Sequence, residues 1–72
     1  MVIVVPGTST LRDLPLHVIV EPDRVNRLAQ STAFQVEQVR AISTVRLTEP
    51  IGAVSAEAMA AVDETLLAVL GL

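Results

Sequence analysis

The chain is organised around an apolar stretch that ends in hydroxyl residues, Val2-Ile3-Val4-Val5-Pro6-Gly7-Thr8-Ser9-Thr10. Four successive β-branched residues favour an extended backbone, and the lack of polar alternation predicts a strand that is buried on both faces. Proline cannot donate a backbone hydrogen bond to a neighbouring strand and glycine permits a positive φ, so the strand must end or bulge at residues 6–7. Three hydroxyl side chains therefore emerge where a core strand leaves the core.

Two interpretations of these hydroxyl residues are open. Thr8, Ser9 and Thr10 are placed by a rigid strand, and hydroxyl groups can donate hydrogen bonds to a phosphate while Gly7 lets a ligand approach the backbone. Alternatively, the same side chains only satisfy backbone groups of a turn, as such residues commonly do. The local sequence by itself favours the turn.

The composition predicts one small domain that spans residues 1–72. A domain of this length buries only roughly 60% of its unfolded surface, and Phe34 is its single aromatic residue. The chain has no cysteine, so neither a disulfide nor a thiolate metal site can stabilise the fold. Oligomerisation is the remaining support for so small a core.

Charge and hydropathy argue against two kinds of protein, those that bind through a basic surface and those that span a membrane. The net charge is −3, with five arginines and no lysine, which argues against binding through a broad basic surface. The sequence holds no apolar run near the roughly 20 residues that span a bilayer, and no basic region precedes the first apolar run. We therefore expect no membrane segment or signal peptide, and a cytoplasmic protein.

The remainder of the chain predicts further strands and one secure helix. Strands are expected at 15–20, 33–42 and 51–54, with a polar loop at 21–27 and a helical turn at 43–47. Ser55 is a good N-cap and Gly71 a natural C-cap for a helix between them. An apolar stripe on that helix should pack on the sheet or on a second copy of the chain; it comprises Met59, Val62, Leu66, Val69 and Leu70. Glu57, Glu64, Thr65 and Ala68 lie away from its centre. The expected fold class is a β-rich α+β domain.

Several segments in this order resemble the MazF/PemK (Kid) family, the toxins of bacterial toxin–antitoxin pairs. The resemblance covers essentially all 72 residues and rests on segments 4–9, 14–18, 36–42, 51–55, 62–64 and 70–72. It implies a small SH3-like barrel of the CcdB/Kid/MazF type with a C-terminal helix. It also implies a homodimer, inhibited by an antitoxin protein, that cleaves single-stranded messenger RNA at specific sequences. The reaction needs no metal or cofactor: the ribose 2′-hydroxyl attacks, leaving a 2′,3′-cyclic phosphate and a 5′-hydroxyl.

The resemblance also implies roles for individual residues. Thr8 matches a catalytic threonine whose hydroxyl donates to the scissile phosphate, and Ser9 follows it in the RNA-binding segment. Glu37 and Gln38 match a Glu-Gln pair that hydrogen-bonds RNA bases, because carboxylate and amide groups can read base edges. His17 alternates with apolar neighbours in a strand, which favours a structural or RNA-contacting role over proton transfer.

The chain departs from the family pattern at its N-terminus. It begins near the third strand of the family, so it is N-terminally truncated relative to that pattern and lacks the hairpin with the motif that supplies a catalytic arginine. None of the five arginines, Arg12, Arg24, Arg27, Arg40 and Arg46, matches that arginine in position. Either the chain starts at an internal methionine of a longer gene, or it is a remnant that dimerises. The alternative function is a catalytically inactive dimerisation and antitoxin-binding module.

Overall fold

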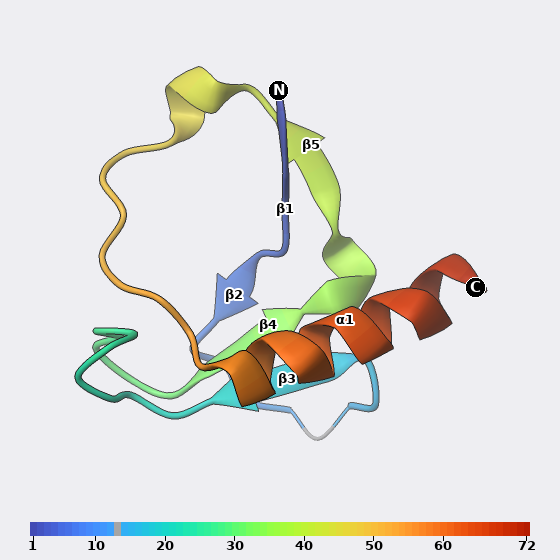
Figure 1. The fold of residues 1–72 in the computed structure, drawn as a ribbon, viewed down its shortest axis with the longest axis horizontal. Coiled ribbons are helices and arrows are strands. Elements are labelled where there is room, and N and C mark those ends of the chain that lie inside the picture. Colours follow the sequence, from blue (N-terminus) through green and yellow to red (C-terminus); the bar gives the residue numbers. More distant parts are fainter. Residues whose placement is uncertain (13) are drawn as a thin grey trace.

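The computed structural model describes residues 1–12 and 14–72. Short antiparallel strands form two small sheets, and one C-terminal helix, which the sequence predicted, lies over the three-stranded sheet (Figure 1). The elements are β1 (Val2–Val4), β2 (Gly7–Thr8), β3 (His17–Val20), β4 (Thr32–Gln35), the 3₁₀ helix η1 (Val36–Gln38), β5 (Arg40–Ile42), the 3₁₀ helix η2 (Thr44–Arg46) and α1 (Ala56–Leu70). The expected fold class is therefore confirmed.

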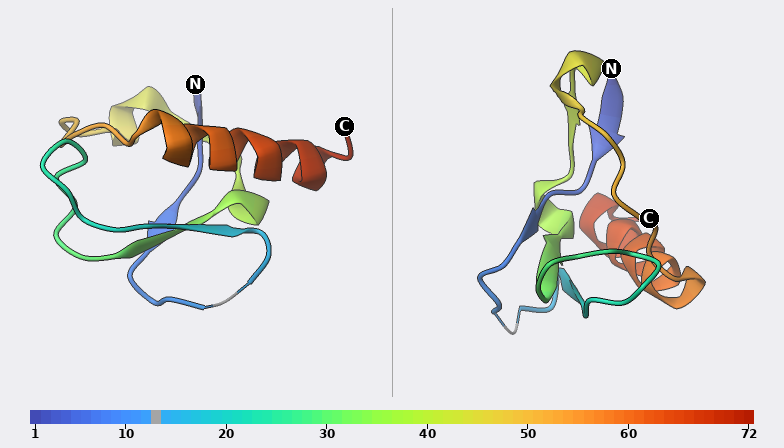
Figure 2. Two further views of the ribbon diagram at one scale, coloured as in Figure 1. Left: turned by 60° about the horizontal axis from the view of Figure 1, so that its bottom comes forward. Right: turned by 90° about the vertical axis from the view of Figure 1, so that its left-hand side faces the viewer.

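The two sheets are joined by chain segments that run from one into the other. The first sheet pairs β1 with β5, and the second has the order β2-β4-β3. The backbone leaves β1 at Val4 and enters β2 at Gly7, so the expected interruption occurs one residue earlier, at residues 5–6. On the facing segment, η1 separates β4 from β5. Figure 2 shows β1 and β5 rising away from the three-stranded sheet.

The expected strand 33–42 is wrong in its middle. Residues 36–38 form η1, whose first residue, Val36, is fully buried. The Val36 N–H donates to the Leu16 carbonyl at 3.2 Å. A buried apolar side chain and this hydrogen bond outside the sheet stabilise the turn, although strand alternation continues in the sequence. The turn expected at 43–47 is confirmed as η2.

Two other strand boundaries also differ from the prediction. The strand predicted at 15–20 begins at His17, because residues 15–16 form a turn whose Leu14 carbonyl accepts from the His17 N–H at 3.1 Å. Residues 51–54 are not a strand. The Ala53 N–H there donates to the Val25 carbonyl at 3.0 Å, so this segment is tied to the loop before β4 and not to a sheet.

Helix α1 begins and ends where its capping residues predicted. The Ser55 hydroxyl accepts from the Ala58 N–H at 3.1 Å, and Gly71 adopts the left-handed conformation at φ 73°. The helix packs against β3 and η1. Its covered face is narrower than the predicted stripe, because Met59 and Leu70 are exposed at the two margins while Thr65 is half-buried. No helix in the described part of the chain is long and apolar enough to cross a membrane.

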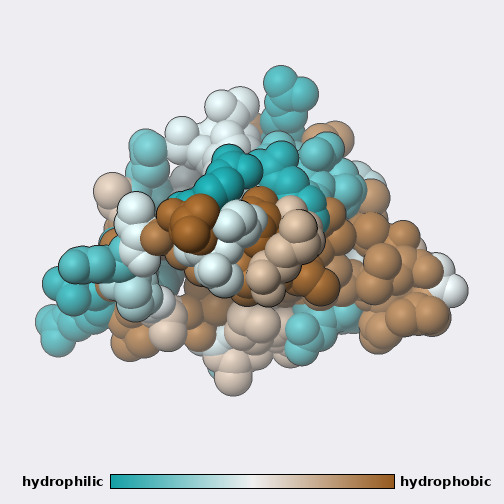
Figure 3. Space-filling model, turned by 90° about the horizontal axis from the view of Figure 1, so that it is seen from above, coloured by the Kyte–Doolittle hydropathy of each residue, from teal (hydrophilic) through white to brown (hydrophobic). Residues whose placement is uncertain are grey.

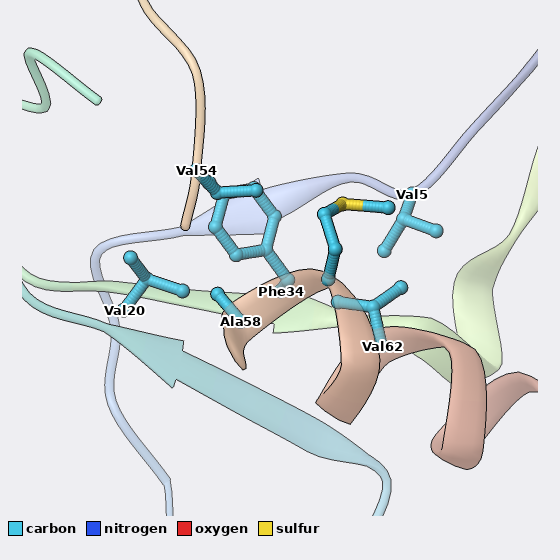
Figure 4. A pocket seen from close by; sticks show the side chains of 7 residues that line it. Val5, Val20, Phe34, Val54, Ala58 and Val62 are labelled. Carbon is cyan, nitrogen blue, oxygen red and sulfur yellow. The ribbon is translucent and has the colours of Figure 1, made fainter. Parts of the chain in front are cut away.

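The apolar core lies between α1 and one face of the β2-β4-β3 sheet. Phe34 and Val20 of the sheet and Val5 meet Ala58 and Val62 of α1 around an apolar pocket (Figure 4). The prediction that residues 2–5 are buried on both faces is wrong, because β5 is the one partner of β1 among the described residues and Ile3 is 75% exposed. Apolar surface also gathers on the side where α1 ends (Figure 3).

Candidate functional site

A polar pocket lies on the face of the β2-β4-β3 sheet opposite to α1. Strand pairing places Thr8 beside Ala33 and His17 beside Gln35. Because alternate residues of a strand point to opposite faces, these side chains share one face, whereas Phe34 points to the core. The residues that line the pocket are Thr8, Thr10, Arg12, Leu14, His17, Gln35 and Glu37.

The pocket contains a buried imidazole in contact with a carboxylate. His17 Nε2 lies 3.1 Å from Glu37 Oε2. The His17 side chain is only 4% exposed, and the Glu37 side chain is 28% exposed. The η1 turn produces this contact, because it buries Val36 and carries the next residue over the start of β3. Two atoms of the pair, His17 Nδ1 and Glu37 Oε1, are buried without a hydrogen-bond partner among the described residues.

The Thr8 hydroxyl fits both interpretations of the hydroxyl segment. Its Oγ1 accepts a hydrogen bond from the Thr10 N–H at 3.1 Å, which is the expected turn contact. A hydroxyl group still has its own proton to donate when its oxygen accepts. Thr8 can therefore stabilise the turn and donate to an anionic oxygen in the pocket at the same time.

The structure brings together only part of the predicted set of site residues. Thr8, His17 and Glu37 line one pocket, whereas Ser9 and Gln38 are exposed and do not line it. Glu37 is directed to His17, so one of its oxygens is already engaged within the protein. The neighbouring Gln38 is the more exposed member of the Glu-Gln pair.

Sequence reasoning missed two pocket residues, Arg12 and Gln35. Arg12 is the cation among the lining residues, and its position two residues after Thr10 was the available signal. Gln35 joins the pocket through its register with His17, which no local pattern reveals. The described residues hold no cluster of three or more histidine or acidic side chains that could bind a metal ion.

A polar pocket with a hydroxyl, a guanidinium and a buried imidazole–carboxylate pair can hold a phosphate. Thr8 and Arg12 supply donors, of which only Arg12 carries charge. His17 and Glu37 form the imidazole–carboxylate contact. This arrangement is compatible with the binding of a phosphoester.

Comparisons with known proteins agree with the fold and with the order of the segments. Residues 1–70 match the family of PemK-like, MazF-like toxins of type II toxin–antitoxin systems. The chain is 39% identical over 67 residues to Endoribonuclease MazF9 of Mycobacterium tuberculosis (strain ATCC 25618 / H37Rv), covering 92% of this chain and 56% of that protein. The chain thus spans little more than half the length of this curated relative.

A solved structure is also similar to the chain. The Mycobacterium tuberculosis toxin MazF-mt6 superimposes with a TM-score of 0.83 at 30% sequence identity, covering 97% of this chain and 69% of that one. The arrangement of the strands and α1 thus belongs to a fold that a MazF toxin shares. From the family match over residues 1–70, we conclude that the chain belongs to the PemK-like, MazF-like toxins of type II toxin–antitoxin systems.

Proposed function

We propose that this chain is an endoribonuclease that cleaves single-stranded messenger RNA and thereby inhibits growth. One observation carries the proposal: the β2-β4-β3 register brings Thr8 and His17 to one face of the sheet, and Arg12 and Glu37 line the same pocket. Two comparisons support the same activity: one relative is named an endoribonuclease, and the matching family consists of toxins.

The proposed reaction is an internal transfer within the RNA. The 2′-hydroxyl gives its proton to water and attacks the adjacent phosphorus, while the P–O5′ bond breaks and the 5′-oxygen takes up a proton from water. The products are a 2′,3′-cyclic phosphate and a 5′-hydroxyl. Thr8 would donate its hydroxyl proton to a phosphate oxygen, and Arg12 would neutralise the charge that develops there.

The proposed base contacts use the side chains around this pocket. Gln38 and Glu37 would hydrogen-bond base edges, and Ser9 would contact the RNA beside Thr8. Acceptor and neutral donor groups suit a chain of net charge −3, because little of its affinity can come from phosphate neutralisation.

The proposed partners are an antitoxin protein and a second copy of the chain, and the proposed location is the cytoplasm. The free edge of β1 and its exposed Ile3 support dimerisation, because an unpaired apolar edge favours pairing with another chain. The expected dimer would place apolar surface of each copy out of water.

The second candidate is an inactive module that binds the antitoxin. It is favoured by one fact: none of the five arginines matches the catalytic arginine that the family resemblance implies. If Arg12 does not replace that group, the fold would retain its interaction surfaces without the activity.

Incubation of a long single-stranded RNA with the purified chain in EDTA separates the two candidates. The wild type and Thr8→Ser should cleave the RNA, and primer extension should map discrete ends. Thr8→Ala should cleave roughly 100-fold more slowly, since it loses a donor to the transition state. If the folded wild type leaves the RNA intact, the endoribonuclease proposal fails, and binding to the antitoxin becomes the function to test.

A further inference from the structure

His17 and Glu37 are exposed to different extents in the polar pocket. Both line the polar pocket, but the imidazole is 4% exposed and the carboxylate 28%. The imidazole is therefore the more deeply buried group of the pair.

The contact also indicates which nitrogen of His17 carries a proton. An ionised carboxylate only accepts hydrogen bonds, so the 3.1 Å contact requires Nε2–H as the donor. Nδ1 is buried and has no partner among the described residues. A proton there would be a buried donor without an acceptor, which is costly. The geometry thus places a proton on Nε2, and the described residues offer no acceptor for one on Nδ1.

Arg12 is a second charged group in the pocket, and it could attract the Glu37 carboxylate away from His17. Arg12 lines the same pocket as Glu37, yet among the described residues the ion pair of Glu37 is with His17 and not with Arg12. A carboxylate released from His17 would be attracted to this guanidinium in the partly desolvated pocket. That pairing would remove the cation from an incoming phosphate.

We propose that His17 is a positioning residue, which fixes the Glu37 carboxylate through Nε2–H and so leaves Arg12 free for the RNA phosphate. The inference rests on the proposed function, and it assigns His17 no proton transfer to the substrate. It predicts that a neutral side chain with a donor at the Nε2 position can replace histidine.

Glutamine and asparagine provide matched replacements for this test. The amide nitrogen of Gln reaches about as far as Nε2, whereas that of Asn reaches only as far as Nδ1; neither amide titrates. His17→Gln should therefore retain kcat within a few-fold and keep the wild-type pH profile. His17→Asn should lower kcat by roughly 100-fold, the scale expected when a reacting geometry is lost, and should raise KM as Arg12 becomes paired.

The kinetic outcomes are all decisive once circular dichroism shows folded variants. If His17→Gln is as inactive as His17→Asn, the imidazole itself moves a proton and the inference is overturned. It is also overturned if both variants match the wild type. The double variant His17→Asn/Glu37→Gln should have a KM close to that of Glu37→Gln alone. The reason is that the neutral amide at position 37 cannot form an ion pair with Arg12.

Nuclear magnetic resonance tests the hydrogen bond without any activity. His17 is the only histidine in the chain, so its ring nitrogens give signals that need no assignment. The wild type should show a proton on Nε2, and Glu37→Ala should lose this preference for Nε2. An unchanged spectrum in Glu37→Ala would overturn the inference.

If the proposed endoribonuclease function fails, the results differ from those expected if the positioning role of His17 fails. In that case the wild type binds single-stranded RNA but leaves it intact. The comparison is then made with dissociation constants: His17→Gln should bind like the wild type, and His17→Asn should bind at least several-fold more weakly. Equal affinities would overturn the positioning role independently of cleavage.

Discussion

Gly52 is packed against the backbone of Asn26, so closely that a Cβ on Gly52 would overlap the Asn26 carbonyl group. The Val25 carbonyl oxygen lies equally close to that position and accepts from the Ala53 N–H at 3.0 Å. This contact joins the loop after β3 to the segment that enters α1. The start of the helix is therefore positioned by a loop that precedes it by about thirty residues in the sequence.

Gly52→Ala should destabilise the chain because its methyl group would meet backbone atoms that cannot rotate away. Overpacking of this kind costs about 1–3 kcal/mol. For a domain of this size each kcal/mol lowers Tm by about 4–8 °C. Thermal unfolding followed by circular dichroism measures the change. Ala53→Ser, at an exposed neighbouring residue, is the control, and equal Tm values for the two variants would contradict the proposed close packing.

Asn26→Ala should be at least as destabilising. Asn26 is 3% exposed, and its Oδ1 accepts from the N–H groups of Asp23 and Leu28, both at 3.0 Å. Its Nδ2 donates to the Glu21 carbonyl at 2.8 Å. Alanine would leave these groups without their partner, at a cost of about 3 kcal/mol in the free energy of unfolding.

Urea unfolding of Asn26→Ala measures this cost directly. Gln30→Ala, at an exposed residue of the same loop, should change the free energy of unfolding by less than about 0.5 kcal/mol. If Asn26→Ala lowers the free energy of unfolding no more than Gln30→Ala does, water replaces the Asn26 side chain without cost.

Ser55→Ala should weaken the start of α1. The hydroxyl accepts from the Ala58 N–H at 3.1 Å, and loss of an N-cap costs about 1 kcal/mol. Ser55→Asp should keep most of the stability, because a carboxylate can accept the same hydrogen bond and favours the helix N-terminus. Urea unfolding compares the three proteins, and a Ser55→Asp as unstable as Ser55→Ala would argue against capping.

Arg12→Gln should weaken RNA binding and make it less sensitive to salt. One lost phosphate contact on a single strand reduces the slope of log K against log salt by about 0.7. Arg46→Gln is the matched control, because Arg46 lies in η2 and does not line the polar pocket. Fluorescence anisotropy with a labelled single-stranded RNA gives both slopes. Equal slopes for the two variants would exclude a special role for Arg12.

Local signals in the sequence were sufficient for α1 and for the breaks in the chain. The Ser55 and Gly71 caps bounded the helix correctly, since each cap acts on backbone groups within one turn. Pro6 interrupted the first strand for an equally local reason. Residues 36–38 were mispredicted because their alternation suits both a strand and a short turn, and the Leu16 carbonyl decides between them.

The sequence by itself determined the family and the helix and predicted Thr8, His17 and Glu37 as site residues, because motif order and capping are encoded within short segments. Only the tertiary structure decided that Arg12 and Gln35 share a pocket with them. It also decided that His17 contacts Glu37, 20 residues further along the chain. The physical reason is that β4 lies between β2 and β3: strand order and register result from hydrogen bonds and burial between distant segments, which no local pattern specifies.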